Sequence, residues 1–352
     1  MTSPLKIGLM GYGFAGATFH APVIEHCGRA VVAAIATSSP DKARADYPDA
    51  TLVVGIDALV ALDIDCVVIA TPNDSHYPLA KQTLEAGKHV VVDKPVTLTA
   101  AEARTLADLA KSKGLVFAPF HNRRWDGDFM TVRDLLAAGT LGRVTHFESH
   151  FDRFRPAVRQ RWREEASRGG GLLFDLGPHL IDQALALFGA PATVSATVQT
   201  HRDNGGAADY VHLLLGYPER EVVLHATALA AIEPPRFAIH GTRGSYVKYG
   251  LDTQEDQLKA GLRAGQPGYG AGNPAGKLRV LEGEGDAAHE VDRELPTLDG
   301  AYGGLYRAVA AAIQDGVPFP VSPDDAVDVM TIIELAQRSA DEGRRLPFTP
   351  LR

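Results

Sequence analysis

Cysteine is scarce in this sequence of 352 residues, which contains only Cys27 and Cys66. Two cysteines are too few for a disulfide framework, and their separation fits no metal-binding motif. Cys66 begins an apolar run over 66–70, so we expect it to be a small core residue rather than half of a disulfide. No bound metal is expected.

Basic residues and long apolar runs are also scarce. The 35 lysines and arginines are outnumbered by 43 aspartates and glutamates, which gives a formal net charge of -8. This balance argues against binding to nucleic acid or to a membrane surface, because either partner needs a concentrated basic face. No apolar stretch approaches the roughly 18 residues of a membrane helix. We expect no secretory signal, because the first expected strand begins at Lys6, and therefore a cytoplasmic protein.

Short apolar runs alternate with helix-like segments from residue 5 to about residue 121. This alternation predicts a parallel sheet covered on both faces, as in a doubly wound Rossmann domain. The helix expected over 100–112 begins with a capping box, formed by Thr99 and by Glu102 three residues later. The expected strands are 6–9, 31–36, 52–54, 66–70, 89–92 and 116–118.

The pattern changes after residue 121. Longer, partly alternating strands follow with few helices between them, which indicates an antiparallel or mixed sheet. The glycine-rich stretch 251–276 is expected to be a loop. The expected helices are 126–138, 175–188, 302–314 and 322–342, and the expected strands are 143–154, 192–202, 210–217, 221–230, 236–240 and 245–249.

These patterns predict an α/β fold with two domains. Residues 1–121 are expected to form the Rossmann domain. Residues 122–352 are expected to form a C-terminal α/β domain with a large, mostly antiparallel sheet, for which the family resemblance described below implies a role in substrate binding and oligomerisation. The C-terminal helices are expected to pack back on the Rossmann domain, with the active site in the cleft between the two domains.

A glycine-rich turn follows the first expected strand and opens a helix, which is the context that dinucleotide binding requires. Gly11 allows the tight bend, Gly13 lets the backbone approach a pyrophosphate, and Gly16 lets helix and strand pack closely. The helix amino terminus then supplies amide donors to the phosphates. The cofactor contacts expected here are Gly11, Tyr12, Gly13, Phe14, Ala15 and Gly16.

The second expected strand ends without the acid that binds the ribose 2′-hydroxyl in NAD enzymes. It presents Thr37, Ser38 and Ser39 instead, whose hydroxyls suit a 2′-phosphate, and Lys42 follows closely. NADP is therefore favoured, although NAD stays open because Asp41 is near. The alternative is an ordinary Ser-Pro turn with Lys42 in solvent.

Polar residues also follow the fourth expected strand, at the sheet edge where ligands bind. Asn73 and His76 are placed to contact the ribose or amide of the cofactor. Helix capping by Asn73 or Asp74 is the alternative. The cofactor contacts expected in this segment are Thr71, Pro72, Asn73 and His76.

An Asp-Lys-Pro element follows the fifth expected strand. A lysine at the end of a parallel strand faces whatever reacts with the nicotinamide, so Lys94 is the first catalytic candidate. The alternative is a solvated surface lysine. We expect Asp93, Lys94 and Pro95 all to contact the cofactor.

Asp175 and His179 are the second pair of catalytic candidates. A spacing of four places both side chains on one helix face, where the carboxylate can orient the imidazole as a general base. The preceding glycines, 169–171, allow close approach of a ligand. The alternatives are a capping aspartate beside an unrelated histidine, or a zinc site, for which no third ligand is suitably spaced.

Arginine and tryptophan gather in the segments expected to border the cleft. Guanidinium groups suit hydroxyls and aromatic rings suit the C–H faces of a polyhydroxylated ligand. Interdomain salt bridges are the alternative. Together with Lys94, Asp175 and His179, the expected substrate contacts are Asn122, Arg123, Arg153 and Trp162, of which Arg123 and Trp162 are also expected to contact the cofactor.

The glycine turn, the Asp-Lys-Pro element and the Asp-x-x-x-His helix together resemble the glucose–fructose oxidoreductase / inositol dehydrogenase / rhizopine catabolism (Gfo/Idh/MocA) family. The similarity covers essentially the whole chain. Stretches such as Phe19-His20-Ala21-Pro22 and Arg161-Trp162-Arg163-Glu164 are similar to its NADP-dependent scyllo-inositol 2-dehydrogenase branch.

The resemblance implies a catalytic group of Lys94, Asp175 and His179, a cis peptide between Lys94 and Pro95, and assembly as a homodimer or homotetramer. Asp93 stands where the family more usually has glutamate. The implied activity is oxidation of a secondary alcohol of a cyclitol or sugar, first of all scyllo-inositol. A glycosidase acting by transient oxidation, another sugar dehydrogenase or reductase of the family, and a non-catalytic nucleotide-binding regulator are the alternatives.

Overall fold

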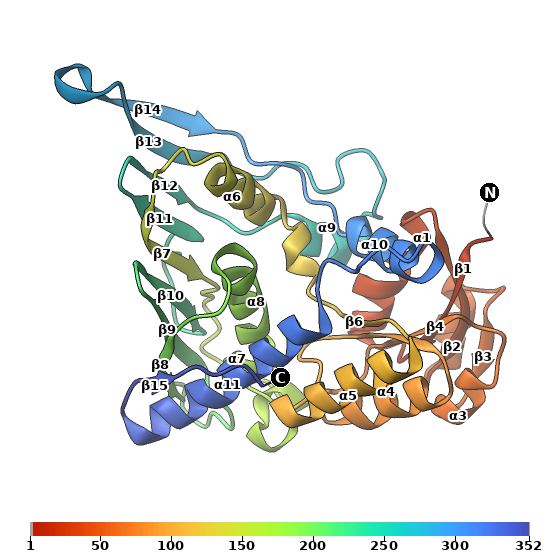
Figure 1. The fold of residues 1–352 in the computed structure, drawn as a ribbon. Coiled ribbons are helices and arrows are strands. Elements are labelled where there is room, and N and C mark those ends of the chain that lie inside the picture. Colours follow the sequence, from red (N-terminus) through yellow and green to blue (C-terminus); the bar gives the residue numbers. More distant parts are fainter. Residues whose placement is uncertain (1–2, 352) are drawn as a thin grey trace.

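Two β-sheets organise the chain in the computed structural model, which describes residues 3–351 (Figure 1). Met1, Thr2 and Arg352, the outermost residues of the two expected domains, lie outside it. A six-stranded sheet is built from the N-terminal third, and a nine-stranded sheet is built from the rest. The predicted α/β fold class is confirmed.

The six-stranded sheet is parallel throughout and has the order β3-β2-β1-β4-β5-β6. Its central strands are apolar and almost completely buried, because helices cover both faces. The strand order reverses between β1 and β4, which is where ligands bind in such sheets. The strands are β1 (Leu5–Met10), β2 (Ala30–Ala36), β3 (Thr51–Val53), β4 (Cys66–Ile69), β5 (His89–Val92) and β6 (Phe117–Pro119).

The helices of this part follow the strands in alternation. The predicted capping box of α5 is present, since Thr99 Oγ1 accepts a hydrogen bond from the Glu102 amide at 3.2 Å. A π-helical segment, η1 (Gly16–His20), leads from the glycine turn into α1. The helices are α1 (Ala21–His26), α2 (Pro40–Asp46), α3 (Gly55–Val60), α4 (His76–Glu85) and α5 (Ala100–Lys113), with a short 3-10 turn at Asn73–Ser75.

The nine-stranded sheet has the order β14-β13-β12-β11-β7-β10-β9-β8-β15. It is antiparallel except where β7 pairs with β10. Helices α6 (Gly127–Ala137) and α8 (Gly177–Phe188) cover the face turned toward the rest of the molecule (Figure 1). The strands are β7 (Val144–His150), β8 (Thr193–Gln199), β9 (Tyr210–Tyr217), β10 (Arg220–Thr227), β11 (Phe237–Gly241), β12 (Gly244–Lys248), β13 (Gly276–Glu282), β14 (His289–Leu295) and β15 (Leu346–Pro347).

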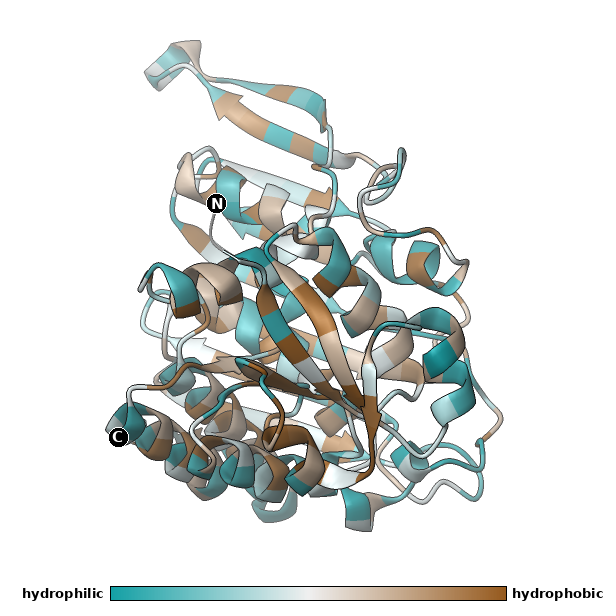
Figure 2. Cartoon of the chain, turned by 90° about the vertical axis from the view of Figure 1, so that its right-hand side faces the viewer, coloured by the Kyte–Doolittle hydropathy of each residue, from teal (hydrophilic) through white to brown (hydrophobic). Residues whose placement is uncertain are grey.

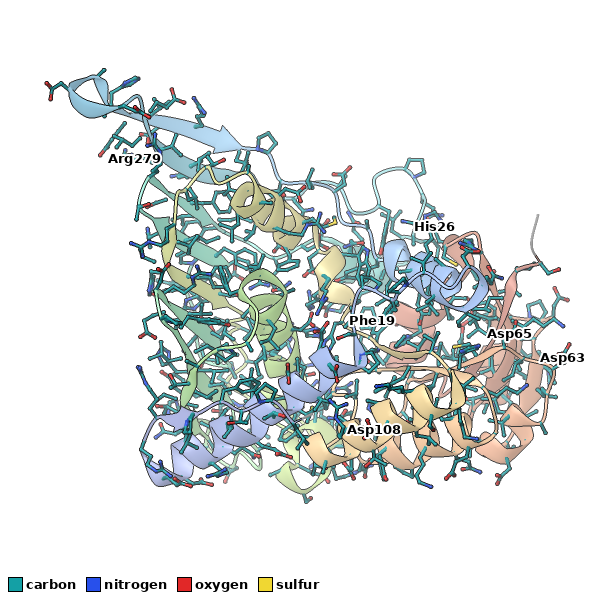
Figure 3. The ribbon with its side chains drawn as sticks, viewed as in Figure 1. Phe19, His26, Asp63, Asp65, Asp108 and Arg279 are labelled. Carbon is teal, nitrogen blue, oxygen red and sulfur yellow. The ribbon has the colours of Figure 1, made fainter. Side chains whose placement is uncertain are left out.

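Strands β13 and β14 were not predicted. They form a hairpin that projects beyond the other strands, marked by Arg279 in Figure 3 and banded by alternating hydropathy in Figure 2. Strand β13 alternates buried and exposed residues, which was a usable signal, whereas β14 is mostly charged and exposed and lacks the apolar alternation of a half-buried strand. The strand expected over 143–154 also ends earlier, at His150, and the expected loop over 251–276 contains a helix, α9 (Gln254–Lys259).

The two C-terminal helices connect the sheets. Helix α10 (Gly303–Gln314) packs against α1, and α11 (Pro323–Glu342) packs against both α5 and β8 (Figure 1). Together, helices α10 and α11 therefore contact both the helices of the parallel sheet and the nine-stranded sheet. No helix within residues 3–351 is both long and apolar enough to cross a membrane.

Candidate active site

A cleft of about 300 Å³ lies between the carboxyl edge of the parallel sheet and the nine-stranded sheet. The loops after β1, β5 and β6 line one side, and Phe19, labelled in Figure 3, lies there between the two halves of the molecule. The residues that line the cleft are Phe14, Ala15, Phe19, Asp93, Lys94, Phe120, Asn122, Arg123, Arg153, Arg155, Arg159, Arg161, Arg163, Asp175, Leu176, His179, Glu255, Lys259 and Tyr302.

The glycine turn after β1 has the geometry that its sequence predicts. Gly11 has a φ of +100°, and a Cβ atom there would lie 2.7 Å from the Ala70 carbonyl oxygen. A Cβ atom on Gly16 would lie 2.2 Å from the Gly11 carbonyl oxygen, whereas one on Gly13 would meet no atom within 4 Å. Gly13 therefore exposes its backbone to open space, which fits the approach of a cofactor pyrophosphate.

The residues expected to select the cofactor lie beside this turn. Ser38, Ser39 and Lys42 are exposed, and the Lys42 ammonium lies 5.7 Å from the centre of the Tyr12 ring. The Thr37 hydroxyl accepts a hydrogen bond from the Ser39 amide at 3.0 Å. Two hydroxyls and an ammonium are thus free to meet a 2′-phosphate next to the glycine turn.

Lys94 is held by Asp175 across the cleft. The Lys94 ammonium donates to the Asp175 carboxylate at 2.9 Å and to its backbone carbonyl at 2.6 Å. Burial would raise the pKa of Asp175, but the cations of Lys94 and Arg163 outweigh it and hold that pKa well below its ordinary value. The Lys94–Pro95 peptide is cis, as the family resemblance implied.

Asp93 stabilises the loop after β5 that carries Lys94. Its carboxylate accepts from the Lys94 amide at 2.7 Å, and its other oxygen lies 3.5 Å from Nε2 of the buried His20. Burial opposes ionisation, yet the contact with His20 outweighs it and lowers the pKa of Asp93 to about 2. Asp93 is therefore an ionised anchor for the backbone of Lys94.

The predicted pairing of Asp175 with His179 is wrong. The expected single helix is divided, because Asp175 ends the short helix α7 (Leu172–Asp175) and His179 lies in the first turn of α8. Across the described residues, no hydrogen bond joins the two side chains, and Nδ1 of His179 has no partner. Asp175 orients Lys94 instead.

His179 is a neutral base in a cationic environment. Its side chain is buried beside Phe151 and lines the cleft. Burial, followed by the charges of Lys94 and Arg123, places the pKa of His179 well below its ordinary value. The imidazole is therefore unprotonated at neutral pH and able to accept a proton.

Arg123 lines the cleft but already has protein partners. Its guanidinium lies 3.2 Å from Asp126 and also pairs with Glu255, and it stacks 4.7 Å from the centre of the Phe151 ring. These ion pairs lie within residues 122–352, so they are not the interdomain salt bridges that the sequence left open as an alternative. Asn122 and Arg153 also line the cleft, whereas Trp162 is not among the lining residues and stacks with Arg163 at 4.4 Å.

Asn73 and His76 are engaged in the protein rather than facing the cleft. The Asn73 amide donates to the Gly169 carbonyl at 2.9 Å. The ring nitrogens of His76 lie 2.7 Å from the Pro95 carbonyl and 2.9 Å from the Thr71 carbonyl, and the side chain is buried. His76 therefore ties the loop after β4 to the loop after β5.

Glu255, Lys259 and Tyr302 line the cleft without having been predicted. The first two belong to α9, inside the stretch expected to be a loop, and their ion pair of 2.7 Å has the i, i+4 spacing of a helix. That spacing was a usable signal in the sequence. Tyr302 donates to Asp126 from the start of α10, a contact between residues 176 positions apart that no local pattern contains.

A dinucleotide turn that opens on the same cleft as a lysine and a neutral imidazole is the arrangement of a nicotinamide-dependent oxidoreductase. Comparison with known proteins agrees with this class. Residues 5–121 match the family model described as oxidoreductase family, NAD-binding Rossmann fold, and residues 133–348 match its C-terminal alpha/beta domain. The chain belongs to the Gfo/Idh/MocA oxidoreductase family.

Individual relatives match over nearly the whole chain. The uncharacterized oxidoreductase YdgJ of Escherichia coli is 49% identical, over 97% of this chain and 97% of YdgJ. The scyllo-inositol 2-dehydrogenase (NADP(+)) IolW of Bacillus subtilis is 37% identical, over 97% of this chain and 95% of IolW. The solved structure of YPO2259 from Yersinia pestis has a TM-score of 0.94 at 45% identity, covering 100% of this chain and 99% of that one.

Proposed function

We propose that this protein is an NADP-preferring dehydrogenase that oxidises a secondary alcohol of a cyclitol or sugar, with scyllo-inositol as the first candidate. The carrying observation is that Lys94 and His179, from opposite sides of the cleft, line the same space as Phe14 and Ala15 of the glycine turn. The substrate candidate comes from the similarity to IolW, whose name states that activity.

His179 acts as the general base in this proposal, because its neutral imidazole takes the proton of the hydroxyl group. Lys94 donates a hydrogen bond to the same oxygen and stabilises the negative charge that develops on it. Asp175 is a positioning residue, since it holds the Lys94 ammonium through two hydrogen bonds. A bound nicotinamide supplies the hydride acceptor.

The exposed hydroxyls of Ser38 and Ser39 and the ammonium of Lys42 support the preference for NADP, because they can bind a 2′-phosphate. Gly11, Gly13 and Gly16 hold the pyrophosphate segment. We also propose a homodimer or homotetramer that uses the face of the nine-stranded sheet opposite α6 and α8, where Figure 1 shows no covering helix of the described chain.

The test is a screen of cyclitols and aldoses, each with NAD and with NADP, that follows the absorbance of the reduced cofactor. The proposal predicts turnover of at least one cyclitol or sugar, with a higher kcat/KM for NADP. Cleavage of a glycoside without net reduction of cofactor would instead indicate the glycosidase activity. Binding of cofactor without turnover of any polyol or glycoside would indicate a regulator.

A further inference from the structure

The active-site cleft is much more basic than the protein that contains it. The chain as a whole has a formal net charge of -8. Eight lysine and arginine side chains line the cleft, against the three acids Asp93, Asp175 and Glu255. The eight cationic residues are Lys94, Arg123, Arg153, Arg155, Arg159, Arg161, Arg163 and Lys259.

Five of these cations have a carboxylate partner. Lys94 and Arg163 share Asp175, Arg123 and Lys259 share Glu255, and Arg161 lies 3.3 Å from Glu164. The other three form no ion pair within 4.0 Å anywhere in residues 3–351. These three are Arg153, Arg155 and Arg159, and we call them the arginine group.

The backbones of Arg153 and Arg155 are fixed by hydrogen bonds to the end of β10 and to the residue that follows it. The Arg153 amide donates to the Thr227 carbonyl at 2.9 Å, and the Arg155 amide donates to the Ala228 carbonyl at 2.7 Å. Side chains alternate along an extended segment, so Arg153 and Arg155 point to one side and Phe154, which is 58% exposed, points to the other. The two guanidinium groups are thereby directed into the cleft.

Positive charges are concentrated around the arginine group. Partial burial lowers the pKa of Arg155, and the neighbouring charges of Arg153, Arg159 and Arg161 lower it further. Arg153, Arg155 and Arg161 also line a smaller cavity that continues from the cleft beside Asp175. A bound anion would relieve this repulsion and accept hydrogen bonds from more than one guanidinium.

We infer that the arginine group is a subsite for an acidic substituent, a carboxylate or a phosphate monoester, on the sugar or cyclitol that reacts at Lys94. The inference rests on the proposed function and specifies its substrate class. Planar guanidinium groups match both oxyanions through paired hydrogen bonds. The same cavity contains Asp175, the partner of Lys94, so the acidic substituent lies near the reacting carbon.

The experiment measures binding by titration calorimetry on the NADP+-loaded protein, so it does not need turnover. The probes are D-glucuronate, D-glucose 6-phosphate and neutral scyllo-inositol. The inference predicts that at least one anionic probe binds more tightly than scyllo-inositol, and that this advantage falls as salt is raised. Arg155→Ala should weaken binding of the anionic probe by about 10- to 100-fold, and it should weaken binding of scyllo-inositol by a smaller factor.

Arg155→Lys separates loss of charge from loss of shape, and it should restore part of the affinity that Arg155→Ala removes. The matched control is Arg133→Ala, which removes an exposed arginine of α6 paired with Asp134. It should leave binding of every probe unchanged. Thermal melting of each variant confirms that it is folded.

Three outcomes overturn the subsite. In the first, neither anion binds more tightly than scyllo-inositol. In the second, Arg133→Ala weakens binding of the anionic probes as much as Arg155→Ala does. In the third, Arg155→Ala weakens binding of NADPH instead of binding of the anionic probes. The last result would assign the arginine group to the phosphates of the cofactor. Turnover of neutral polyols without anion binding would leave the proposed function standing, whereas anion binding without any turnover would support the subsite alone.

Discussion

The Lys94 ammonium lies 2.9 Å from the Asp175 carboxylate, although 81 positions separate the two residues in the sequence. Lys94 follows β5 of the parallel sheet, and Asp175 ends α7 near the nine-stranded sheet. This ion pair therefore joins the two halves of the molecule at the cleft. It also makes the position of the proposed catalytic lysine depend on a residue from the other half.

This dependence predicts coupling between Lys94→Ala and Asp175→Asn. Lys94→Ala should lower kcat by about 10²- to 10³-fold, because it removes the donor to the reacting oxygen. Asp175→Asn should lower kcat less, and it should have little further effect when Lys94 is already alanine. A double-mutant cycle on kcat measures this coupling, with Lys277→Ala on the exposed hairpin as the control lysine. Additive losses would show that Asp175 does not act through Lys94.

The lowered pKa of His179 predicts the pH dependence of oxidation. Only the neutral imidazole accepts a proton, and its pKa is held below the ordinary value of 6.5. The acid limb of kcat/KM for alcohol oxidation should therefore lie below pH 6.5. His179→Ala should lose about 10²- to 10⁴-fold in kcat and should lose this limb. A limb at or above pH 6.5 that survives the substitution would assign the base to another group.

The same shift predicts a loss of stability in acid. The unfolded chain binds a proton at His179 near pH 6.5, whereas the folded protein does not until the pH is lower. The free energy of unfolding should therefore fall as the pH drops below 6.5. Denaturant unfolding at pH 7.5 and 5.5 measures the fall, which should be smaller in His179→Leu. An equal fall in both proteins would contradict the assignment to this residue.

Gly13 and Gly16 should respond differently to a single methyl group. A Cβ atom on Gly13 meets no protein atom, so Gly13→Ala should keep the melting temperature and weaken binding of NADPH. A Cβ atom on Gly16 would clash with the Gly11 carbonyl, so Gly16→Ala should lower the melting temperature. Thermal melting with and without NADPH tests both. Unchanged NADPH affinity in Gly13→Ala would place the pyrophosphate elsewhere.

The absence of an acid at the end of β2 predicts that cofactor choice can be reversed. Ser39→Asp should repel the 2′-phosphate and should bind the 2′-hydroxyl of NAD. We expect kcat/KM for NADP to fall by about tenfold or more, and the value for NAD to rise or to be maintained. Lys42→Ala should weaken NADP alone. Equal effects of Ser39→Asp on both cofactors would place the ribose away from this loop.

Local patterns in the sequence were sufficient for the first sheet and its motifs. Buried apolar strands, the glycine turn and the capping box at Thr99 each involve residues a few positions apart, and the structure confirms them. The order of the strands in the nine-stranded sheet depends on contacts between distant segments. For that sheet the sequence predicted the class of sheet but not its exposed hairpin.

Predictions for individual site residues were wrong where a side chain has a partner far away in the sequence instead of the nearby one that spacing suggested. The spacing of Asp175 and His179 suggested one helix face, but the helix breaks at Leu176 and Asp175 bonds to a residue 81 positions away. Arg123 has carboxylate partners at Asp126 and at the distant Glu255. The pairs Lys94–Asp175 and Arg123–Glu255 join residues far apart in the sequence, and periodicity and spacing do not predict such pairs.

The most direct test is a crystal structure of the protein with NADP+ and the best substrate from the screen. One hydroxyl oxygen of the substrate should lie within hydrogen-bond distance, about 2.6–3.2 Å, of both the Lys94 ammonium and a ring nitrogen of His179. Its carbon should face the nicotinamide ring. A substrate whose carbinol nearest the nicotinamide contacts neither side chain would contradict the proposed chemistry.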